Sequence, residues 1–167
     1  MTGRKNRSDV SHQPRRDRMD AERVNDPYRS RGKWKEPTTC PECGAIFHHG
    51  HWQWGTAVPG ADQHLCPACQ RIRDRVPAGE LTLSGPFFAE HREEILHLVR
   101  HTEAKARAEH ALERIIEVKE EGDRTVVTLT DSHLTHGIGE ALHHAYHGEF
   151  DSRYTDEGDL LRAAWSR

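Results

Sequence analysis

Four cysteines, arranged as two Cys-x-x-Cys pairs, are the residues of this chain whose spacing points most directly to chemistry. The pairs are Cys40 with Cys43 and Cys66 with Cys69, and the sequence holds no other cysteine. Two residues between the members of a pair let both thiolates bind one ion, and two pairs complete a tetrahedral site. We therefore predict a four-cysteine site for structural Zn²⁺. Because the four thiolates leave no open position for water, catalysis at this metal is disfavoured.

Three other uses of these cysteines stay open. Disulfides suit secreted domains, but no apolar leader follows Met1, so we expect a reducing, cytoplasmic setting. A thioredoxin-like redox pair requires one Cys-x-x-Cys in a βαβ context, whereas this chain has two pairs. Iron also binds four thiolates, so the sequence does not separate an iron site from a zinc site.

Histidine supplies a second set of candidate ligands, because the chain contains 14 of these residues. Four of them lie between or beside the cysteine pairs: His48, His49, His51 and His64. With four cysteines present, we expect these histidines at the surface or in contacts to a partner. The histidine-rich segment 133–147 carries His133 and His136 at i,i+3 spacing, and His143 and His147 at i,i+4 spacing. Such pairs bind a metal only with further ligands, so a second site there stays open.

Composition and motifs narrow the class of protein. The sequence contains no P-loop, no GxGxxG, no Gly-x-Ser-x-Gly and no HExxH motif, and we therefore expect a protein that is not an enzyme. No apolar run is long enough to span a bilayer, so we expect no membrane partner. Of the 167 residues, 31% are charged and 34% hydrophobic, which predicts that part of the chain lies outside any packed core.

Charge divides the chain into unequal parts, although the net charge is only −3. Residues 1–36 hold 11 Lys/Arg against 6 Asp/Glu, a net charge of +5. Residues 37–85 carry −1, and residues 86–167 carry −7. A basic arm joined to an acidic body is typical of a chain with a polyanion partner, and a solvated tail without a target is the alternative.

We predict three segments: a disordered basic arm at 1–36, a four-cysteine zinc-ribbon module at 37–79 and an α+β domain at 80–167. In the module, residues 45–47 and 51–55 are expected to form a hairpin. The expected elements of the α+β domain, in the order α-β-β-α-β, are a helix at 86–107, strands at 112–118 and 124–130 around a turn at 120–123, a helix at 133–146 capped by Asp131 or Ser132, and a last strand at 160–165. Both helices are expected on one face of the sheet.

Cations beside aromatic rings make RNA the polyanion that we expect as partner, because Arg and Lys bind phosphates while rings stack on bases. The candidate RNA-binding residues are Arg29, Arg31, Lys33, Trp34, Lys35, Trp52, Trp54, Arg71, Arg73 and Arg75. Packing is the alternative for the tryptophans: Trp34 against the metal module, and Trp52 with Trp54 over its small core, which is the role that we favour for this pair. A solvated helix start or turn is the alternative for Arg71, Arg73 and Arg75, which follow Cys69.

Several strings of the sequence resemble a group of short bacterial proteins. These strings are Cys-Pro-Glu-Cys-Gly-Ala at 40–45, His-Trp-Gln-Trp at 51–54, Leu-Cys-Pro-Ala-Cys-Gln-Arg-Ile at 65–72, Pro-Ala-Gly-Glu-Leu-Thr-Leu-Ser-Gly at 77–85 and His-Arg-Glu-Glu-Ile-Leu at 91–96, with Ile-Gly-Glu-Ala-Leu at 138–142. The group is related to the nonsense-mediated-decay-associated export adaptor of the large ribosomal subunit. The resemblance covers about residues 31–167 and implies a zinc module, an α+β domain and contact with ribosomes. Only the four zinc ligands carry over residue by residue.

These observations favour a non-enzymatic zinc-binding protein that binds RNA or the ribosome and affects ribosome stability or mRNA decay. A protein–protein adaptor that docks through the acidic residues 86–167 is one alternative, and a zinc- or redox-responsive stress protein is another. Salt-sensitive RNA binding, nuclease-resistant capture of a protein partner and reversible release of zinc by mild oxidant would separate the three.

Overall fold

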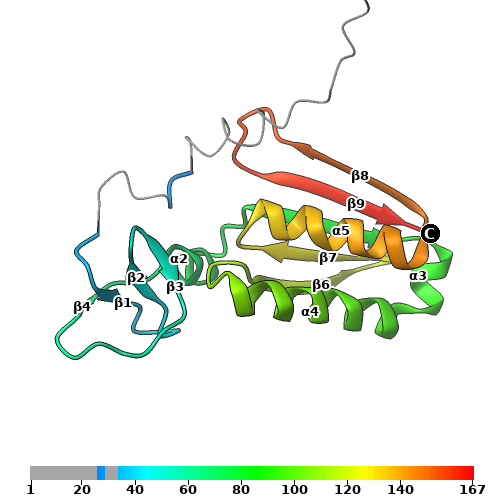
Figure 1. The fold of residues 1–167 in the computed structure, drawn as a ribbon. Coiled ribbons are helices and arrows are strands. Elements are labelled where there is room, and N and C mark those ends of the chain that lie inside the picture. Colours follow the sequence, from blue (N-terminus) through cyan, green and yellow to red (C-terminus); the bar gives the residue numbers. More distant parts are fainter. Residues whose placement is uncertain (1–25, 29–33) are drawn as a thin grey trace, which may run out of the picture.

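The computed structural model describes residues 26–28 and 34–167, which form two packed parts (Figure 1). We call residues 34–76, which hold both cysteine pairs, the ribbon module, and residues 77–167 the α+β domain. Most of the predicted basic arm, residues 1–25 and 29–33, lies outside the described residues. The described residues 26–28 of that arm contact the ribbon module through Asp26 and Tyr28, and Trp34, which lies in both ranges, packs on Trp52.

The ribbon module is a small four-stranded sheet followed by one helix. Its strands are β1 (Thr38–Thr39), β2 (Ile46–His48), β3 (His51–Gln53) and β4 (Asp62–Gln63), in the order β3-β2-β1-β4. The predicted hairpin is confirmed: β2 pairs antiparallel with β3, with Phe47 opposite Trp52. Helix α2 (Pro67–Asp74) corresponds to the helix start that was the alternative for the arginines after Cys69.

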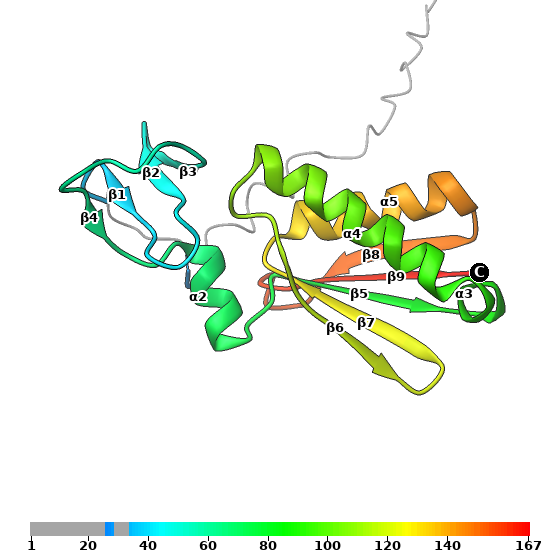
Figure 2. The same cartoon turned by 90° about the horizontal axis from the view of Figure 1, so that it is seen from below.

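The α+β domain contains five strands and three helices. The elements are β5 (Gly79–Ser84), α3 (Pro86–Glu90), α4 (Arg92–Glu109), β6 (Ile115–Glu121), β7 (Arg124–Leu129), α5 (Ser132–Tyr146), β8 (Glu149–Tyr154) and β9 (Leu161–Ser166). The sheet has the order β6-β7-β5-β9-β8, in which only β5 and β9 run parallel. Helices α4 and α5 lie side by side on one face, as predicted (Figure 2).

The core of the α+β domain lies between that face and the helices. Strand residues at alternate positions point inward, such as Leu81 and Leu83 of β5. They meet Ile95 of α4 and Ile138 of α5, which recur at helical spacing and are fully buried. The opposite face of the strands carries small and polar residues instead, such as Thr82 of β5.

The predicted order α-β-β-α-β is incomplete, because the structure adds β5 before the first helix and β8 before the last strand. Strand β5 has Leu81 and Leu83 as its only large buried side chains, so its sequence reads as a lead-in to the helix. Strand β8 lies at the sheet edge, and its outward residues are charged while Phe150 packs inward. An edge strand with so few apolar residues gives a weak alternation.

The helix predicted at 86–107 is two helices, α3 and α4, which meet at His91. The backbone amides of Phe87 and Phe88 donate to the carbonyl oxygen of Arg167 at 2.8 and 3.1 Å. These bonds hold α3 against the end of β9. Local periodicity in the sequence cannot predict such a long-range contact, so it did not predict the break between the two helices. The predicted helix cap is confirmed at Asp131, whose Oδ1 accepts the amide N–H of Leu134 at 3.0 Å.

None of the helices in the described part of the chain is long and apolar enough to cross a membrane.

Candidate metal centre

The four cysteine sulfurs converge at one point of the ribbon module, as predicted. They lie within 4.8 Å of one another, with Cys40, Cys66 and Cys69 buried and Cys43 half-buried. The sulfurs of Cys43 and Cys66 are 3.7 Å apart. A tetrahedron with metal–sulfur bonds of about 2.3 Å has sulfur–sulfur edges of about 3.8 Å. The site therefore fits a tetrahedral ion such as Zn²⁺.

Two tight backbone turns hold the two pairs. In the first, the amide of Gly44 donates to the carbonyl of Cys40 at 2.9 Å, and Gly44 has φ +78°. A positive φ suits glycine, which has no Cβ. In the second, Cys66 is the N-cap of α2, and its sulfur accepts the amide N–H of Cys69 at 3.4 Å. The amide of Cys66 in turn donates to the sulfur of Cys40 at 3.3 Å.

Arg114 completes the surroundings of the sulfurs, and sequence reasoning missed it. Its guanidinium donates to the sulfurs of Cys43, Cys69 and Cys66 at 3.1, 3.3 and 3.6 Å. Arg114 belongs to the α+β domain, where it precedes β6, and it is only 4% exposed. Arg114 lies 45 or more residues from the cysteines that it contacts, so no local sequence pattern connects them. The one sign of a special role in the sequence was a single arginine directly before an apolar strand.

The thiols differ in how readily they ionise. Burial opposes ionisation of Cys40, but the backbone N–H groups of Cys66 and Cys43 more than offset it and lower the pKa of Cys40 to about 7. Burial raises the pKa of Cys69 to about 11, against hydrogen bonds from Arg114, and it raises the pKa of Cys66 further. A bound cation would favour the thiolate at every position.

Histidines do not join the cysteine cluster. Among the described residues, the four cysteines are the one group of three or more potential ligands that lies close enough to hold an ion. His64 stacks on Trp34 with ring centroids 4.0 Å apart. His48 lies 3.5 Å from the Glu36 carboxylate. The histidine-rich segment, now seen as α5, shows no such group in the part of the chain that the structure describes.

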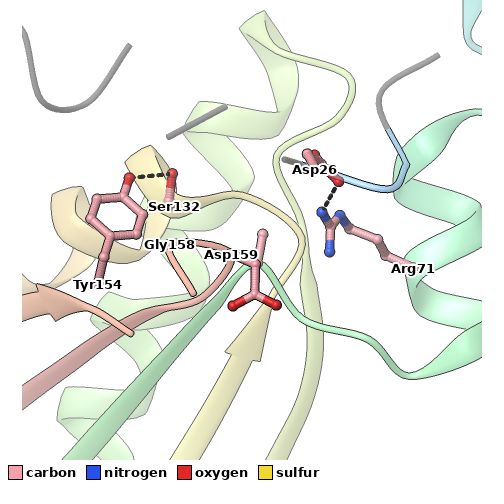
Figure 3. Close-up of a pocket in the computed structure, with 7 residues that line it drawn as sticks. Asp26, Arg71, Ser132, Tyr154, Gly158 and Asp159 are labelled. Carbon is pink, nitrogen blue, oxygen red and sulfur yellow. Dashed lines mark hydrogen bonds and ion pairs between the residues drawn. The ribbon is translucent and has the colours of Figure 1, made fainter. Parts of the chain in front are cut away.

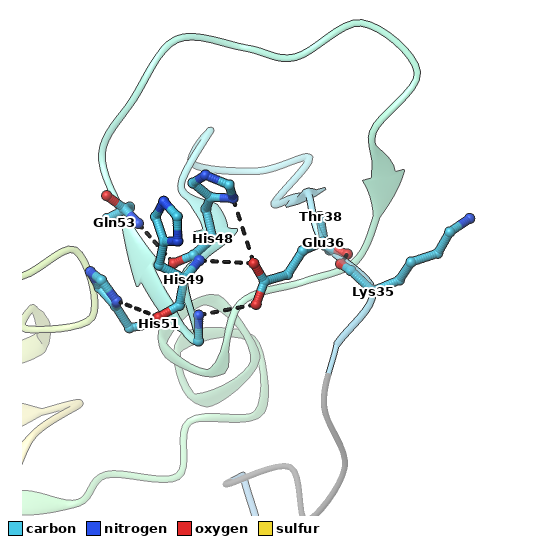
Figure 4. Close-up of polar contacts among 8 residues, drawn as sticks. Lys35, Glu36, Thr38, His48, His49, His51 and Gln53 are labelled. Atoms are coloured by element: carbon cyan, nitrogen blue, oxygen red, sulfur yellow. Dashed lines mark hydrogen bonds and ion pairs between the residues drawn. The ribbon is translucent and has the colours of Figure 1, made fainter.

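Glu36 fixes the turn of the hairpin between β2 and β3 (Figure 4). Its two carboxylate oxygens accept the backbone N–H groups of His49 and Gly50 at 2.9 and 3.0 Å. The bond from His49 is the largest influence on Glu36 and lowers the pKa of this carboxyl. The turn is thereby tied to the chain segment that enters β1.

The structure places two candidate tryptophans inside the ribbon module. Trp52 is 8% exposed and packs on Phe47, with ring centroids 5.6 Å apart. Trp34 meets the edge of Trp52 at 6.1 Å and is half-buried. The packing alternative therefore describes both residues. Trp54 is half-buried, and its indole N–H donates to the carbonyl of Arg107 in α4 at 2.6 Å.

The three arginines of α2 and its end do not share one surface. Arg71 is 4% exposed, bonds the Asp26 carboxylate and the carbonyl of Val76, and lies 4.5 Å from the Tyr28 ring centroid. Figure 3 shows Arg71 pointing toward Asp26, at a cavity of about 50 Å³. Arg73 is exposed and pairs with Glu42.

Two of the remaining candidate RNA-binding residues are exposed to solvent, and three lie outside the described residues. Arg75 is exposed in left-handed backbone at the end of α2, and the Lys35 side chain is 78% exposed, 3.4 Å from Asp62. Arg29, Arg31 and Lys33 lie outside the described residues. Of the ten candidates, Lys35, Arg73 and Arg75 are thus the cations that the structure shows at the surface.

Comparison with known proteins returns no relative. No protein-family model matches the chain, no curated protein matches it, and no solved structure matches it. The resemblance to relatives of the ribosomal export adaptor therefore stays a prediction from sequence.

Proposed function

We propose that this chain is a non-enzymatic zinc-binding protein that uses one structural metal centre to present a basic surface to RNA, including ribosomal RNA. The convergence of four thiols within 4.8 Å is the observation that carries the metal part of the proposal. Protein sulfurs supply every position of a tetrahedral ion, which is the arrangement of structural rather than catalytic zinc. Burial of three of the four cysteines supports the same role.

Exposed cations of the ribbon module support the RNA part. Lys35, Arg73 and Arg75 are exposed there, with Lys35 beside Asp62 and Arg73 paired with Glu42, and the sequence of residues 1–36 adds a net charge of +5. Because Arg71, Trp34 and Trp52 pack inward, phosphate contacts rather than base stacking should dominate, and binding should depend little on RNA sequence. Trp54 lines an apolar hollow of about 310 Å³ beside β2 and β3.

The open face of the larger sheet does not suit base stacking. RNA-binding sheets of the RRM type stack bases on aromatic residues of their central strands. Here the outward residues of the central strands include Thr82 of β5, Val126 and Thr128 of β7, and Ala164 of β9. We therefore assign RNA contact to the ribbon module and not to this face.

RNA binding is tested by fluorescence anisotropy of a short labelled RNA at increasing salt. We expect the affinity of the full chain to fall steeply with salt, because bound phosphates release counterions. Replacing Arg73 and Arg75 by Gln should weaken binding. It should also reduce the slope of the logarithm of the binding constant against the logarithm of the salt concentration by about 1 to 2. Arg162→Gln, at an exposed position of β9, is the matched control and should leave the RNA affinity and its salt dependence unchanged.

Failure to bind RNA at low salt would contradict the RNA part and leave the metal part standing. The net charge of −7 on residues 86–167 then favours the adaptor role instead. Capture of a protein partner that survives nuclease but is lost on reversing acidic charges of this segment would be the corresponding result.

A further inference from the structure

The two parts of the molecule meet at the metal centre itself. Residues of the α+β domain reach into the small core of the ribbon module: Ala111 is 1% exposed within it, and Leu112 packs against it. The indole of Trp54 donates across the same junction to Arg107. Arg114 is the residue of this junction that touches the cysteine sulfurs.

The guanidinium of Arg114 is held in place from its own side of the junction. Its Nε donates to the carbonyl of Ala111 at 2.9 Å, and its backbone N–H donates to Oγ1 of Thr130 at 2.9 Å. Its two terminal nitrogens are thus aimed at the sulfurs, with the ring of Trp54 5.6 Å from Cζ. Such a fork of donors in a fixed plane is a property of arginine that lysine lacks.

Charge explains why a cation is buried here. Four thiolates around a divalent ion carry a net charge of −2, and a buried cation is stable only when an anion compensates it. The three sulfurs that accept from Arg114 supply that anion. Without the ion, the four sulfurs lose the centre that holds them together, so the acceptors of Arg114 no longer converge.

We propose that Arg114 is a positioning residue that couples metal binding to the docking of the ribbon module on the α+β domain. The inference rests on the proposed structural metal site and adds that the site is a joint between two parts. Coupling of this kind is reciprocal: if the ion strengthens docking, docking strengthens the affinity for the ion by the same factor. Loss of an outer-shell partner typically lowers metal affinity by about 10- to 100-fold.

The first readout is the zinc affinity of the full chain, measured by competition with a chromogenic chelator. We expect Arg114→Met, which keeps the length but removes the charge, to weaken zinc binding about 10- to 100-fold. Arg114→Lys keeps the positive charge but lacks the planar set of donors. Its zinc affinity should therefore lie between that of Arg114→Met and that of the unmodified chain. Arg100→Met, at an exposed position of α4, is the matched control and should bind zinc like the unmodified chain.

The second readout is exchange of two indole N–H signals by NMR. The indole of Trp54 bonds Arg107 across the junction, whereas that of Trp165 bonds the carbonyl of His147 within the α+β domain at 2.8 Å. Chelation of zinc, and Arg114→Met with zinc present, should each expose Trp54 and leave Trp165 protected. A purely local packing role for Arg114 would leave the Trp54 indole protected in Arg114→Met with zinc bound, as it is in the unmodified chain.

Three results would overturn the proposal: unchanged zinc affinity in a folded Arg114→Met variant, equal affinities of Arg114→Lys and the unmodified chain, or a Trp54 indole that stays protected after chelation. If Arg114→Met fails to fold, seen as loss of Trp165 protection, the zinc affinity and Trp54 protection of Arg114→Lys decide. Absence of zinc binding by the unmodified chain would instead refute the proposed metal site, and the coupling with it.

Discussion

The four cysteines form a symmetric pattern in the sequence but occupy unequal positions in the structure. Cys66 is fully buried and also caps α2, so its sulfur serves both the site and the helix. Cys43 is half-buried and accepts the shortest of the three hydrogen bonds that Arg114 donates to sulfur, 3.1 Å. Spacing alone predicts the ligand set, because the ligand types and their intervals define the site. It does not predict which sulfur is exposed or what neutralises the cluster.

Loss of one ligand should abolish the site. We expect Cys69→Ser and Cys43→Ser to lower zinc affinity by more than about 100-fold, above the range for losing an outer-shell partner, and to unfold the ribbon module. Metal content and NMR spectra of the purified variants provide the measurement. His51→Ala, at an exposed position of the hairpin, is the control and should keep its zinc. Retained zinc and fold in both cysteine variants would refute the four-thiolate site.

Zinc affinity should rise with pH. Burial raises the pKa of Cys69 to about 11 and that of Cys66 above its ordinary value, so both thiols hold protons at neutral pH. Zinc binds the thiolate and must displace these protons, so the affinity should change about tenfold per pH unit for each proton displaced. Competition titrations between about pH 6 and pH 8, corrected for the chelator's own protonation, measure the slope. An affinity that is flat over this interval would show that the thiols are already ionised.

At the scale of elements, helix α5 shows how one glycine sets a packing distance. A Cβ on Gly139 would lie 2.0 Å from the ring of Phe150 in β8, whereas a Cβ on Gly137 of the same helix would meet nothing within 4 Å. The close approach of α5 to β8 therefore requires glycine at position 139 only. The sequence shows two glycines two residues apart and does not distinguish them.

Alanine at the two positions should act in opposite directions. Gly137→Ala should raise the free energy of unfolding by about 0.5–1 kcal/mol, because alanine is the better helix former. Gly139→Ala has the same benefit but overpacks against Phe150, and should lower the free energy of unfolding by about 1–3 kcal/mol. Urea unfolding of the two variants tests the pair. Stabilisation by both substitutions would mean that α5 and β8 are less closely packed.

The elements that sequence patterns predicted correctly are those with strong local periodicity. Strand β7 alternates buried residues at Thr125, Val127 and Leu129, and α5 combines an Asp131 cap with buried Ile138. Strand β5 and the break at His91 escaped prediction because they depend on pairing with β9 and on contact with Arg167, which are long-range contacts. Strand β8 pairs with the next strand of the chain, and it escaped because it has few apolar residues.

At the scale of the whole molecule, the junction at Arg114 joins a part that has little core of its own to one that has a full core. The buried cluster of the ribbon module includes Cys40, Cys66 and Cys69 themselves, whereas that of the α+β domain is built from aliphatic and aromatic residues. A module whose core consists partly of metal ligands depends on the metal for folding. No single-segment pattern could have shown this, because Arg114 is distant in sequence from the cysteines it contacts.

Metal removal should separate the two parts. With zinc bound, we expect one cooperative thermal transition, because docking and metal binding are linked. With excess chelator, the ribbon module should already be unfolded before heating, so the transition that remains should be that of the α+β domain, with a smaller enthalpy. Differential scanning calorimetry with and without chelator makes the comparison. A single unchanged transition in chelator would contradict the dependence of the ribbon module on metal.

Native mass spectrometry of the full chain is the most direct test of one zinc ion held by four cysteine thiolates. We expect a chain that carries one zinc ion and has lost the corresponding thiol protons, and a metal-free mass after any single cysteine is replaced by serine. A chain that carries no metal, one whose cysteines are paired as disulfides, or one that carries iron in place of zinc would contradict it.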